Sequence, residues 1–334
     1  MGYYVTFDGG GSKSLAILFD DQLRYVASAR SGSINRNGCT EEGMWQHLHD
    51  CFSELLAIAR PVAIERLYVC TPGSNCEVLE ALQHFVPVHA VTELTEGEMA
   101  CLSADVGGTA LVVIAGTGTN ISHYQNGKPA APDMFASGWG ALVYDGGSGY
   151  SVGRGALQAA VADVELYGPP TMLTREILLH YGEKEFSQLR IRLYNQLSPV
   201  REIASLAPLV AHCAEAGDAE ALRVLHWNAE QLLRQVSGYL KRFPECISYP
   251  LVTAGGAWKL TQMRNFFCAR MAELYPTMQV VAPRFEPVMG GALLYGRGAG
   301  YSTDELTQTL IKNFSRFTLP DVGETRKRKD DVLC

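Results

Sequence analysis

Two glycine-rich loops carry the residue types that bind phosphate. The first glycine loop runs Asp8-Gly9-Gly10-Gly11-Ser12-Lys13-Ser14, and the second runs Gly116-Thr117-Gly118-Thr119-Asn120. Consecutive glycines let the backbone approach a polyphosphate closely, while Ser12 and Lys13 add a hydroxyl and a positive charge. Asp8 could hold Mg²⁺, because hard cations favour carboxylate oxygen. Each loop alone also fits an ordinary hairpin turn, but two of them together predict a site that binds a nucleotide's phosphates.

Neither loop matches the most familiar nucleotide motifs. The Walker A pattern GxxxxGK[ST] is absent from the chain. A dinucleotide fingerprint requires a helix after the glycines, whereas a strand-like segment, Leu15 to Phe19, follows the first glycine loop. The loops therefore predict phosphate binding at the turn of a hairpin.

A third glycine element lies late in the chain, in Leu251-Val252-Thr253-Ala254-Gly255-Gly256-Ala257-Trp258. A buried strand that ends in Gly255 and Gly256 leaves flat backbone against which a purine could lie. The same residues also fit a strand-to-helix turn, and both interpretations stay open on this pattern alone.

The segments around the loops predict two halves of similar topology. The first half should contain three antiparallel strands, a helix and a buried strand, at residues 3–7, 15–19, 24–29, 44–59 and 64–70. The second half opens in the same order, with a strand at 109–115, a glycine loop and a hairpin that turns at Asn126-Gly127. A largely helical stretch and the strand at 250–254 follow. This weak internal repeat predicts an α/β fold with mixed sheets and a cleft between two domains.

Length, charge and composition narrow the class of protein. The chain has 334 residues, enough for two domains, and 47% of them are hydrophobic. Its net charge of −7 disfavours a nucleic-acid partner, which usually leaves a basic footprint. No apolar run approaches the roughly 18 residues that span a bilayer, and no leader peptide precedes the first strand. We therefore expect a cytoplasmic protein without a membrane partner.

The cysteines predict no covalent framework. The nine cysteines form an odd set without a CxxC pair. The spacing predicts neither disulfide bonds nor a zinc site, and we expect most cysteines to be reduced packing residues.

With these motifs in this order, the chain resembles the BadF/BadG/BcrA/BcrD ATPase family, and within it the N-acetylglucosamine kinase-like branch. The resemblance runs from Tyr4 to about Gly300. Its most specific parts are the two glycine loops, Ser137-Gly-Trp-Gly, Asp145-Gly-Gly-Ser-Gly and Pro287-Val-Met-Gly-Gly-Ala. It implies two actin-like ATPase (ribonuclease H-like) domains with flanking helices: residues 1–108, then 109–300 with a helical insertion. A C-terminal helix and polar tail would occupy 301–334.

The resemblance also implies roles for individual residues. It implies ATP and Mg²⁺, with Asp8 near the metal. The residues that would contact the phosphates are Gly10, Gly11, Ser12, Lys13, Thr117 and Gly118, and the nucleotide-side glycines are Gly255 and Gly256. The residues that would bind the sugar are Asn35, Thr119, Asn120, Gly138, Trp139, Gly140 and Asp145.

The catalytic base is where the chain departs from the family pattern. The family has an Asp at the start of the helix before the second glycine loop, and the chain offers Glu96 there. Thr95-Glu96-Gly97-Glu98 fits a capping box in which Thr95 and Glu98 cap the helix, which leaves Glu96 free in its first turn. Asp145 is the alternative base, and a chain weak or inactive as a sugar kinase is the third possibility.

The resemblance implies an ATP-dependent kinase that acts on a sugar hydroxyl, with N-acetylglucosamine converted to its 6-phosphate as the first expectation. Two rivals stay open. One is an ATPase that activates a reductase or dehydratase through an iron–sulfur cluster, although no cysteine lies in a recognisable ligating motif. The other is a regulator that only binds nucleotide. A homodimer is the default oligomeric state.

Overall fold

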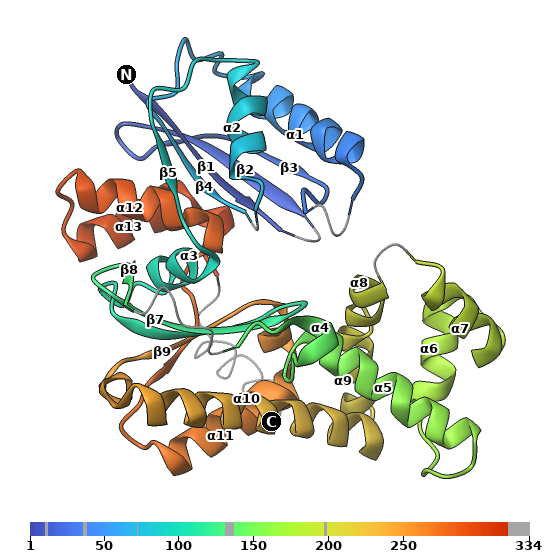
Figure 1. Ribbon diagram of the computed structural model, residues 1–334. Helices are drawn as coiled ribbons and strands as arrows, with labels where there is room; N and C mark the ends of the chain where they lie inside the picture. Colours follow the sequence, from blue (N-terminus) through green and yellow to red (C-terminus); the bar gives the residue numbers. More distant parts are fainter. Residues whose placement is uncertain (11–12, 36–38, 72, 131–136, 197–198, 320–334) are drawn as a thin grey trace, which may run out of the picture. The chain divides into compact units, whose positions relative to one another are not determined.

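The computed structural model describes residues 1–10, 13–35, 39–71, 73–130, 137–196 and 199–319 (Figure 1). The chain divides into two compact units. The first unit combines Met1–Thr109, Tyr124–Pro129 and Ala282–Cys334, and the second combines Ala110–His123 with Ala130–Val281. The first unit thus takes in residues 282–300, which the predicted partition at 108/109 and 300/301 assigns to the second domain. The predicted domain boundaries remain a prediction, because compact units and domains are not the same thing.

The first unit is built on a mixed five-stranded sheet in the order β3-β2-β1-β4-β5. Its strands are β1 (Tyr3–Gly9), β2 (Ser14–Asp20), β3 (Tyr25–Ser31), β4 (Arg66–Cys70) and β5 (Val91–Glu93). β1, β2 and β3 pair antiparallel, which confirms the predicted meander, while β4 pairs parallel to both β1 and β5.

Each face of this sheet has its own hydrophobic core, because alternate side chains of a strand point to opposite faces. Val5 and Phe7 of β1 pack with α1 (Glu41–Leu56) and α2 (Asn75–Gln83). Ile17 and Phe19 of β2 belong to the other core. The helices on that side are α3 (Glu96–Ser103), α12 (Gly290–Gly298) and α13 (Thr303–Asn313).

Close packing explains why residues after 281 join the first unit. The Thr6 hydroxyl donates a hydrogen bond to the Val288 carbonyl at 2.6 Å, in the 3₁₀ turn η3 (Pro287–Met289). A Cβ at Gly291 would lie 2.4 Å from the Thr6 Oγ1 atom, so only glycine fits this approach of α12 to β1. The Gly-Gly pair after Pro287 therefore has a packing role.

A second sheet, whose order is β10-β9-β6-β7-β8, has the same pattern as the first; most of it belongs to the second unit, while Tyr124–Pro129 is counted with the first. Its strands are β6 (Ala110–Ala115), β7 (Thr119–Gln125), β8 (Lys128–Pro129), β9 (Leu251–Ala254) and β10 (Val280–Val281). β9 pairs parallel to β6 and β10, and β7 pairs antiparallel to β8. The second glycine loop separates β6 from β7 as the first separates β1 from β2, which confirms the predicted repeat of topology.

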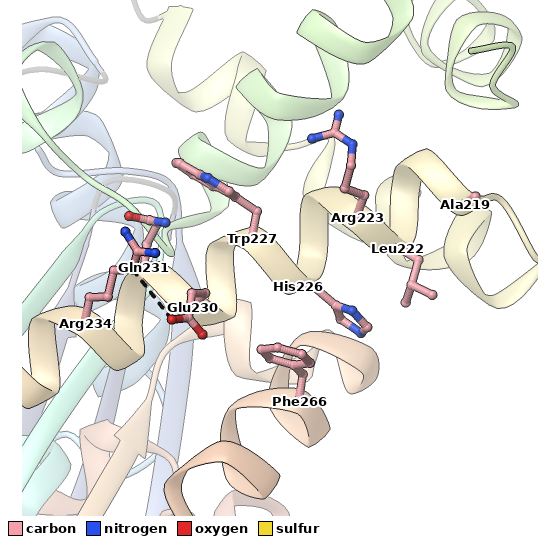
Figure 2. A pocket seen from close by; sticks show the side chains of 9 residues that line it. All are labelled: Ala219, Leu222, Arg223, His226, Trp227, Glu230, Gln231, Arg234 and Phe266. Atoms are coloured by element: carbon pink, nitrogen blue, oxygen red, sulfur yellow. Dashed lines mark ion pairs between the residues drawn. The ribbon is translucent and has the colours of Figure 1, made fainter. Parts of the chain in front are cut away.

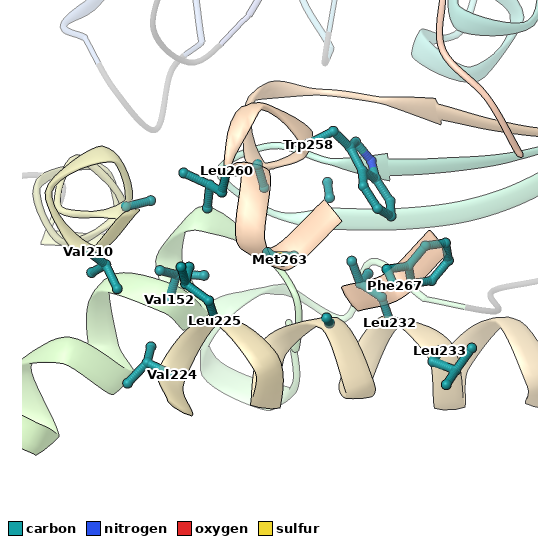
Figure 3. Packing of buried hydrophobic residues seen from close by; sticks show 14 of the residues in the cluster. Val152, Val210, Val224, Leu225, Leu232, Leu233, Trp258, Leu260, Met263 and Phe267 are labelled. Carbon is teal, nitrogen blue, oxygen red and sulfur yellow. The ribbon is translucent and has the colours of Figure 1, made fainter. Parts of the chain in front are cut away.

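Helices make up most of the second unit. α10 (Ala219–Arg242) begins at the N-cap Asp218, and α11 (Thr261–Leu274) packs beside it. Their contact buries Leu225, Leu232 and Phe267 in one core (Figure 3). The other helical elements of this unit are α4 (Gly140–Val143), α5 (Gly149–Val164), α6 (Leu173–Tyr181), α7 (Phe186–Tyr194), α8 (Pro199–Ala204), α9 (Ala207–Glu215), η1 (Pro244–Ser248) and η2 (Gly256–Lys259). The short η4 (Ser315–Phe317) belongs to the first unit. Within the described ranges, no helix has the length and apolar character that crossing a membrane requires.

Candidate functional site

The first glycine loop closes a tight turn between β1 and β2. The Gly10 N–H donates a hydrogen bond to the Lys13 carbonyl at 3.0 Å, so this amide is used within the turn. A Cβ at Gly9 would lie 2.3 Å from the Ile34 Cδ1 atom, which explains this glycine by packing. Gly11 and Ser12 lie outside the described residues. The Lys13 side chain is exposed and available to an anion.

Asp8 stands near the end of β1 among other acidic groups. Burial is the largest cause that raises the pKa of Asp8 to about 7; the carboxylates of Glu96 and Glu286 also raise it, and Lys13 opposes them. Two other carboxyl groups of the first unit therefore act on Asp8. A bound cation would relieve this crowding of negative charge. The donor set fits Mg²⁺, which takes carboxylate oxygen ligands.

Glu96 and Glu98 have different roles at the start of α3. The Thr95 hydroxyl accepts the Glu98 N–H at 3.2 Å, and the Glu98 carboxylate accepts the Thr95 N–H at 2.7 Å. This confirms the predicted capping box, in which Glu96 takes no part. The Glu96 side chain keeps contact with solvent, yet the protein around it displaces enough water to raise the pKa of Glu96 above its usual value. A raised pKa makes a carboxylate a stronger base.

Glu286 is a member of this acidic group that sequence reasoning missed. It comes just before η3 and forms an ion pair with Arg30 at 3.4 Å. Its position directly before the Pro287-Val-Met-Gly-Gly-Ala segment was the available signal. No spacing rule connects it to Asp8, because the fold alone brings the two segments together.

Asn35 lies in the loop after β3, beside the first glycine loop. The Ser33 hydroxyl links the two segments: it donates to the Gly10 carbonyl at 3.4 Å and accepts the Asn35 N–H at 3.3 Å. Two predicted site residues, Gly10 and Asn35, are therefore brought together within the first unit.

The second glycine loop is held by the start of α5. The Gly149 N–H donates to the Gly116 carbonyl at 2.7 Å, and the Tyr150 N–H donates to the Thr117 carbonyl at 3.3 Å. The Gly116 N–H in turn donates to the Gly118 carbonyl at 2.8 Å. These bonds fix the loop as a rigid turn, in which the Thr117 side chain stays exposed.

Asp145 is a buried carboxylate of the second unit. Its Oδ1 atom accepts the Thr119 N–H at 2.7 Å and the Thr119 hydroxyl at 2.8 Å. Burial raises the pKa of Asp145, and the two bonds from Thr119 lower it. A Cβ at Gly118 would lie 3.0 Å from the Asp145 Oδ2 atom. Asp145 is therefore held against the second glycine loop.

Three other residues predicted to bind a sugar, Thr119, Asn120 and Gly138, lie near this carboxylate. Thr119 and Asn120 belong to the start of β7, where a loop was expected. A Cβ at Gly138 would lie 3.3 Å from the Asn120 Nδ2 atom, so these two residues touch. Gly138 and Gly140 both have positive φ, and Trp139 between them exposes 56% of its surface. Thr119, Asn120, Gly138 and Asp145 thus form one cluster within the second unit.

Packing requires glycine at Gly255 but not at Gly256. Gly255 has a φ of 102°, and a Cβ there would lie 2.5 Å from the Ala115 carbonyl oxygen, so only glycine fits. It therefore abuts the end of β6, next to the second glycine loop. Gly256 starts η2, where a Cβ would meet no atom within 4 Å. The strand-to-helix turn explains Gly255 but gives no packing reason for Gly256.

A pocket of about 550 Å³ lies elsewhere, along α10 beside α11. Figure 2 shows Glu230 paired with Arg234, at 3.6 Å, and the His226 ring facing Phe266, with which it stacks at 4.4 Å. Leu222, predicted as part of the buried stripe of α10, lines this pocket instead. None of the predicted site residues lines it, and it offers no glycine loop. We place the chemistry at the loops, because the acidic groups and the rigid turns are there.

Comparisons with known proteins agree with the fold and the motifs. The sequence profile of the BadF/BadG/BcrA/BcrD ATPase family matches residues 7–296. An N-acetylmuramic acid/N-acetylglucosamine kinase of Clostridium acetobutylicum is 24% identical over 309 residues, which cover 88% of this chain and 98% of that protein. An N-acetyl-D-glucosamine kinase of Dictyostelium discoideum is 22% identical over 318 residues, covering 87% and 97%.

Among solved structures, one from Porphyromonas gingivalis, provisionally described as an N-acetylglucosamine kinase, superposes with a TM-score of 0.69. The match covers 90% of this chain and 100% of that one at 18% sequence identity, so it shows a shared fold. This confirms the predicted α/β class with mixed sheets and flanking helices. With the profile matching nearly the whole sequence, the chain belongs to the BadF/BadG/BcrA/BcrD ATPase family.

Proposed function

We propose that the chain is an ATP-dependent sugar kinase, which transfers the γ-phosphoryl group of ATP to a hydroxyl of an amino sugar. The observation that supports this proposal is that the two glutamates at the start of α3 have different roles. Glu98 is fixed in the helix cap, while Glu96, with a raised pKa, faces the charge of Asp8 at the first glycine loop. A carboxylate of raised pKa beside a phosphate-binding loop suits a base that acts on a hydroxyl.

In the proposed reaction, the sugar hydroxyl oxygen attacks the γ-phosphorus while Glu96 accepts the hydroxyl proton. The bond between the γ-phosphorus and the bridging oxygen breaks, and ADP leaves with that oxygen. Asp8 would hold Mg²⁺, with Glu286 close enough to contribute to the same negative field. When bound, the metal would neutralise charge on the phosphates.

The remaining residues would position the two substrates. Gly10, Gly11, Ser12, Lys13, Thr117 and Gly118 would contact the phosphates, and Gly255 and Gly256 would lie on the nucleotide side. Asn35, Thr119, Asn120, Gly138, Trp139, Gly140 and Asp145 would bind the sugar. Since Thr119 already donates to Oδ1 of Asp145, the Oδ2 atom is the one we expect to accept a sugar hydroxyl.

The names of the relatives support an amino sugar as acceptor, and N-acetylglucosamine, converted to its 6-phosphate, is the acceptor we propose. Glucosamine, N-acetylmuramate and glucose differ from it by single groups, so a few pocket contacts would decide among them. A homodimer and a cytoplasmic location remain predictions.

The test is a coupled assay of ADP formation with Mg-ATP against these four sugars, in wild type, Glu96→Gln and Glu98→Gln. Glu98→Gln is the matched control, because it removes the same charge two residues away and Gln still completes a capping box. We expect acceptor-dependent turnover that falls about 10²–10⁴-fold in Glu96→Gln and changes little in Glu98→Gln. Turnover near the wild-type rate in Glu96→Gln would refute the base, and ADP formation that no sugar stimulates would refute the kinase.

A further inference from the structure

Three residues that can bind a metal meet at the far end of β7 from the second glycine loop. One ligand atom each of His123, Glu245 and Cys246 lies within 4.8 Å of the other two. His123 belongs to β7, and the other two belong to η1, which follows the end of α10. His123 exposes 4% of its surface and Cys246 none, while Glu245 is exposed. The cluster therefore consists of two buried side chains, His123 and Cys246, and one exposed carboxylate, Glu245.

The chemistry of these three groups matches a single class of ion. Imidazole, thiolate and carboxylate are the protein ligands of Zn²⁺, which often takes three of them and a water molecule. Zinc–ligand bonds of about 2.0–2.3 Å place tetrahedral ligand atoms about 3.5 Å apart. Metal binding would draw the three ligand atoms closer together, and the exposed side chain of Glu245 is the one that packing confines least. A thiolate and a carboxylate would also balance the charge of Zn²⁺, so the filled site would be neutral where it is buried.

A separate contact fixes the orientation of the histidine ring. The His123 Nδ1 atom shares a hydrogen bond of 2.8 Å with the Tyr239 hydroxyl of α10. The Phe243 ring packs at 4.9 Å from the imidazole. When Nδ1 donates to this hydroxyl, the lone pair of Nε2 is left for a metal. Histidine ligands in metalloproteins are oriented in this way by a partner on the other ring nitrogen.

We propose that His123, Glu245 and Cys246 form a Zn²⁺ site, in which a water molecule would take the fourth position. The ion would join β7 to η1 just beyond the end of α10. Thr119 and Asn120 start the same strand, so the ion would hold the strand that carries part of the proposed sugar site. Sequence spacing argued against zinc because no CxxC pair is present. It could not show this site, since its ligands come from distant segments and include one cysteine.

The test is metal binding by the full chain after chelator treatment. We expect about one equivalent of Zn²⁺ per chain by elemental analysis, and a thiolate-to-cobalt charge-transfer band when Co²⁺ replaces it. Cys246→Ala and His123→Asn should lose the band. Tyr239→Phe should weaken Zn²⁺ binding about 10-fold, because it removes only the partner of the histidine. Cys213→Ala, which removes a buried cysteine of α9, should bind as wild type does.

Glu245→Gln is included because a substitution of this surface side chain should leave the fold intact, whereas the variants at the two buried ligands could fail to fold. Zn²⁺ should raise the melting temperature of wild type and Cys213→Ala more than that of Glu245→Gln. The site would be refuted if wild type binds Co²⁺ without a thiolate band. It would equally be refuted if Cys246→Ala or Glu245→Gln binds Zn²⁺ as tightly as wild type. Sugar kinase activity is not the readout, so this result is independent of the proposed function.

Discussion

The two glycine loops follow the same topology but hold their carboxylates in opposite ways. At the first loop, Asp8 lies among Glu96 and Glu286, and burial and these charges raise its pKa to about 7. At the second loop, Asp145 accepts two hydrogen bonds from Thr119, which lower its pKa against the effect of burial. One carboxylate is crowded by like charge, and the other is satisfied by donors.

This difference suits the two carboxylates to different functions. Crowded carboxylates destabilise the fold until a cation or a proton arrives, so they suit metal binding and proton transfer. A carboxylate with fixed donors keeps one orientation, so it suits the recognition of a hydroxyl. Substitutions in the first unit should therefore change kcat and metal dependence, and those in the second should change KM for the sugar.

The largest effect is expected for Asp8→Asn. This change keeps the size of the side chain but removes the charge that would hold Mg²⁺. We expect kcat to fall about 10²–10³-fold, with a higher Mg²⁺ concentration needed for half-maximal rate. Steady-state ADP formation across a Mg²⁺ titration measures both. An unchanged Mg²⁺ dependence would place the metal elsewhere.

Asp8 should also make stability depend on pH. Its folded pKa, about 7, is above the ordinary 3.8, so the folded state holds the proton more tightly. Its contribution is complete at low pH and is lost as pH rises from 3.8 to about 7, by roughly 4 kcal/mol. Lys13, Glu96, Glu286 and Cys70 are the titratable groups that act with it.

Urea unfolding at a series of pH values measures this contribution. The free energy of unfolding of wild type should decline relative to Asp8→Asn across that window, and saturating Mg²⁺ should restore part of it. Parallel curves for the two proteins would show that Asp8 is not crowded by charge.

Asp145→Asn tests the second loop. The amide oxygen can still accept from Thr119, so we expect the fold to persist. A lost hydrogen bond to a charged group should raise KM for the sugar about 10–100-fold, with a smaller change in kcat. Kinetics at saturating ATP separate the two constants. A fall in kcat alone would instead favour Asp145 as the base.

The smallest effect is expected for Gly118→Ala. The new methyl group would lie 3.0 Å from the Asp145 Oδ2 atom, so the carboxylate must shift slightly. We expect a loss of about 1 kcal/mol in the free energy of unfolding. Gly116→Ala is the matched control for stability, because its nearest contact is 3.9 Å away. Equal stability of the two variants would mean that Asp145 is not held firmly.

Local patterns were enough to predict much of the fold. Alternating apolar residues and the glycine turn predicted β1 to β3, and the T-x-x-E pattern predicted the cap of α3, because these structures form between neighbours in the sequence. Thr119 and Asn120 were expected in a loop but extend β7, since a strand partner overrides local preference.

The acidic group around Asp8 could be predicted only in part. Asp8 and Glu96 each follow a local signal, a strand end and a helix start. Glu286 has none, and its effect on Asp8 arises from packing between distant segments. The predicted domain boundary and the compact units differ over residues 282–300 for the same reason, because the fit of Gly291 against Thr6 is not visible in sequence.

The discontinuous first unit has a consequence for how the chain is made. Its second core joins Phe19 and Tyr68 to Phe285 and Phe314. During synthesis, one face of this sheet stays incompletely covered until α12 and α13 have left the ribosome. Until then, its apolar side chains are exposed to chaperones and to other nascent chains.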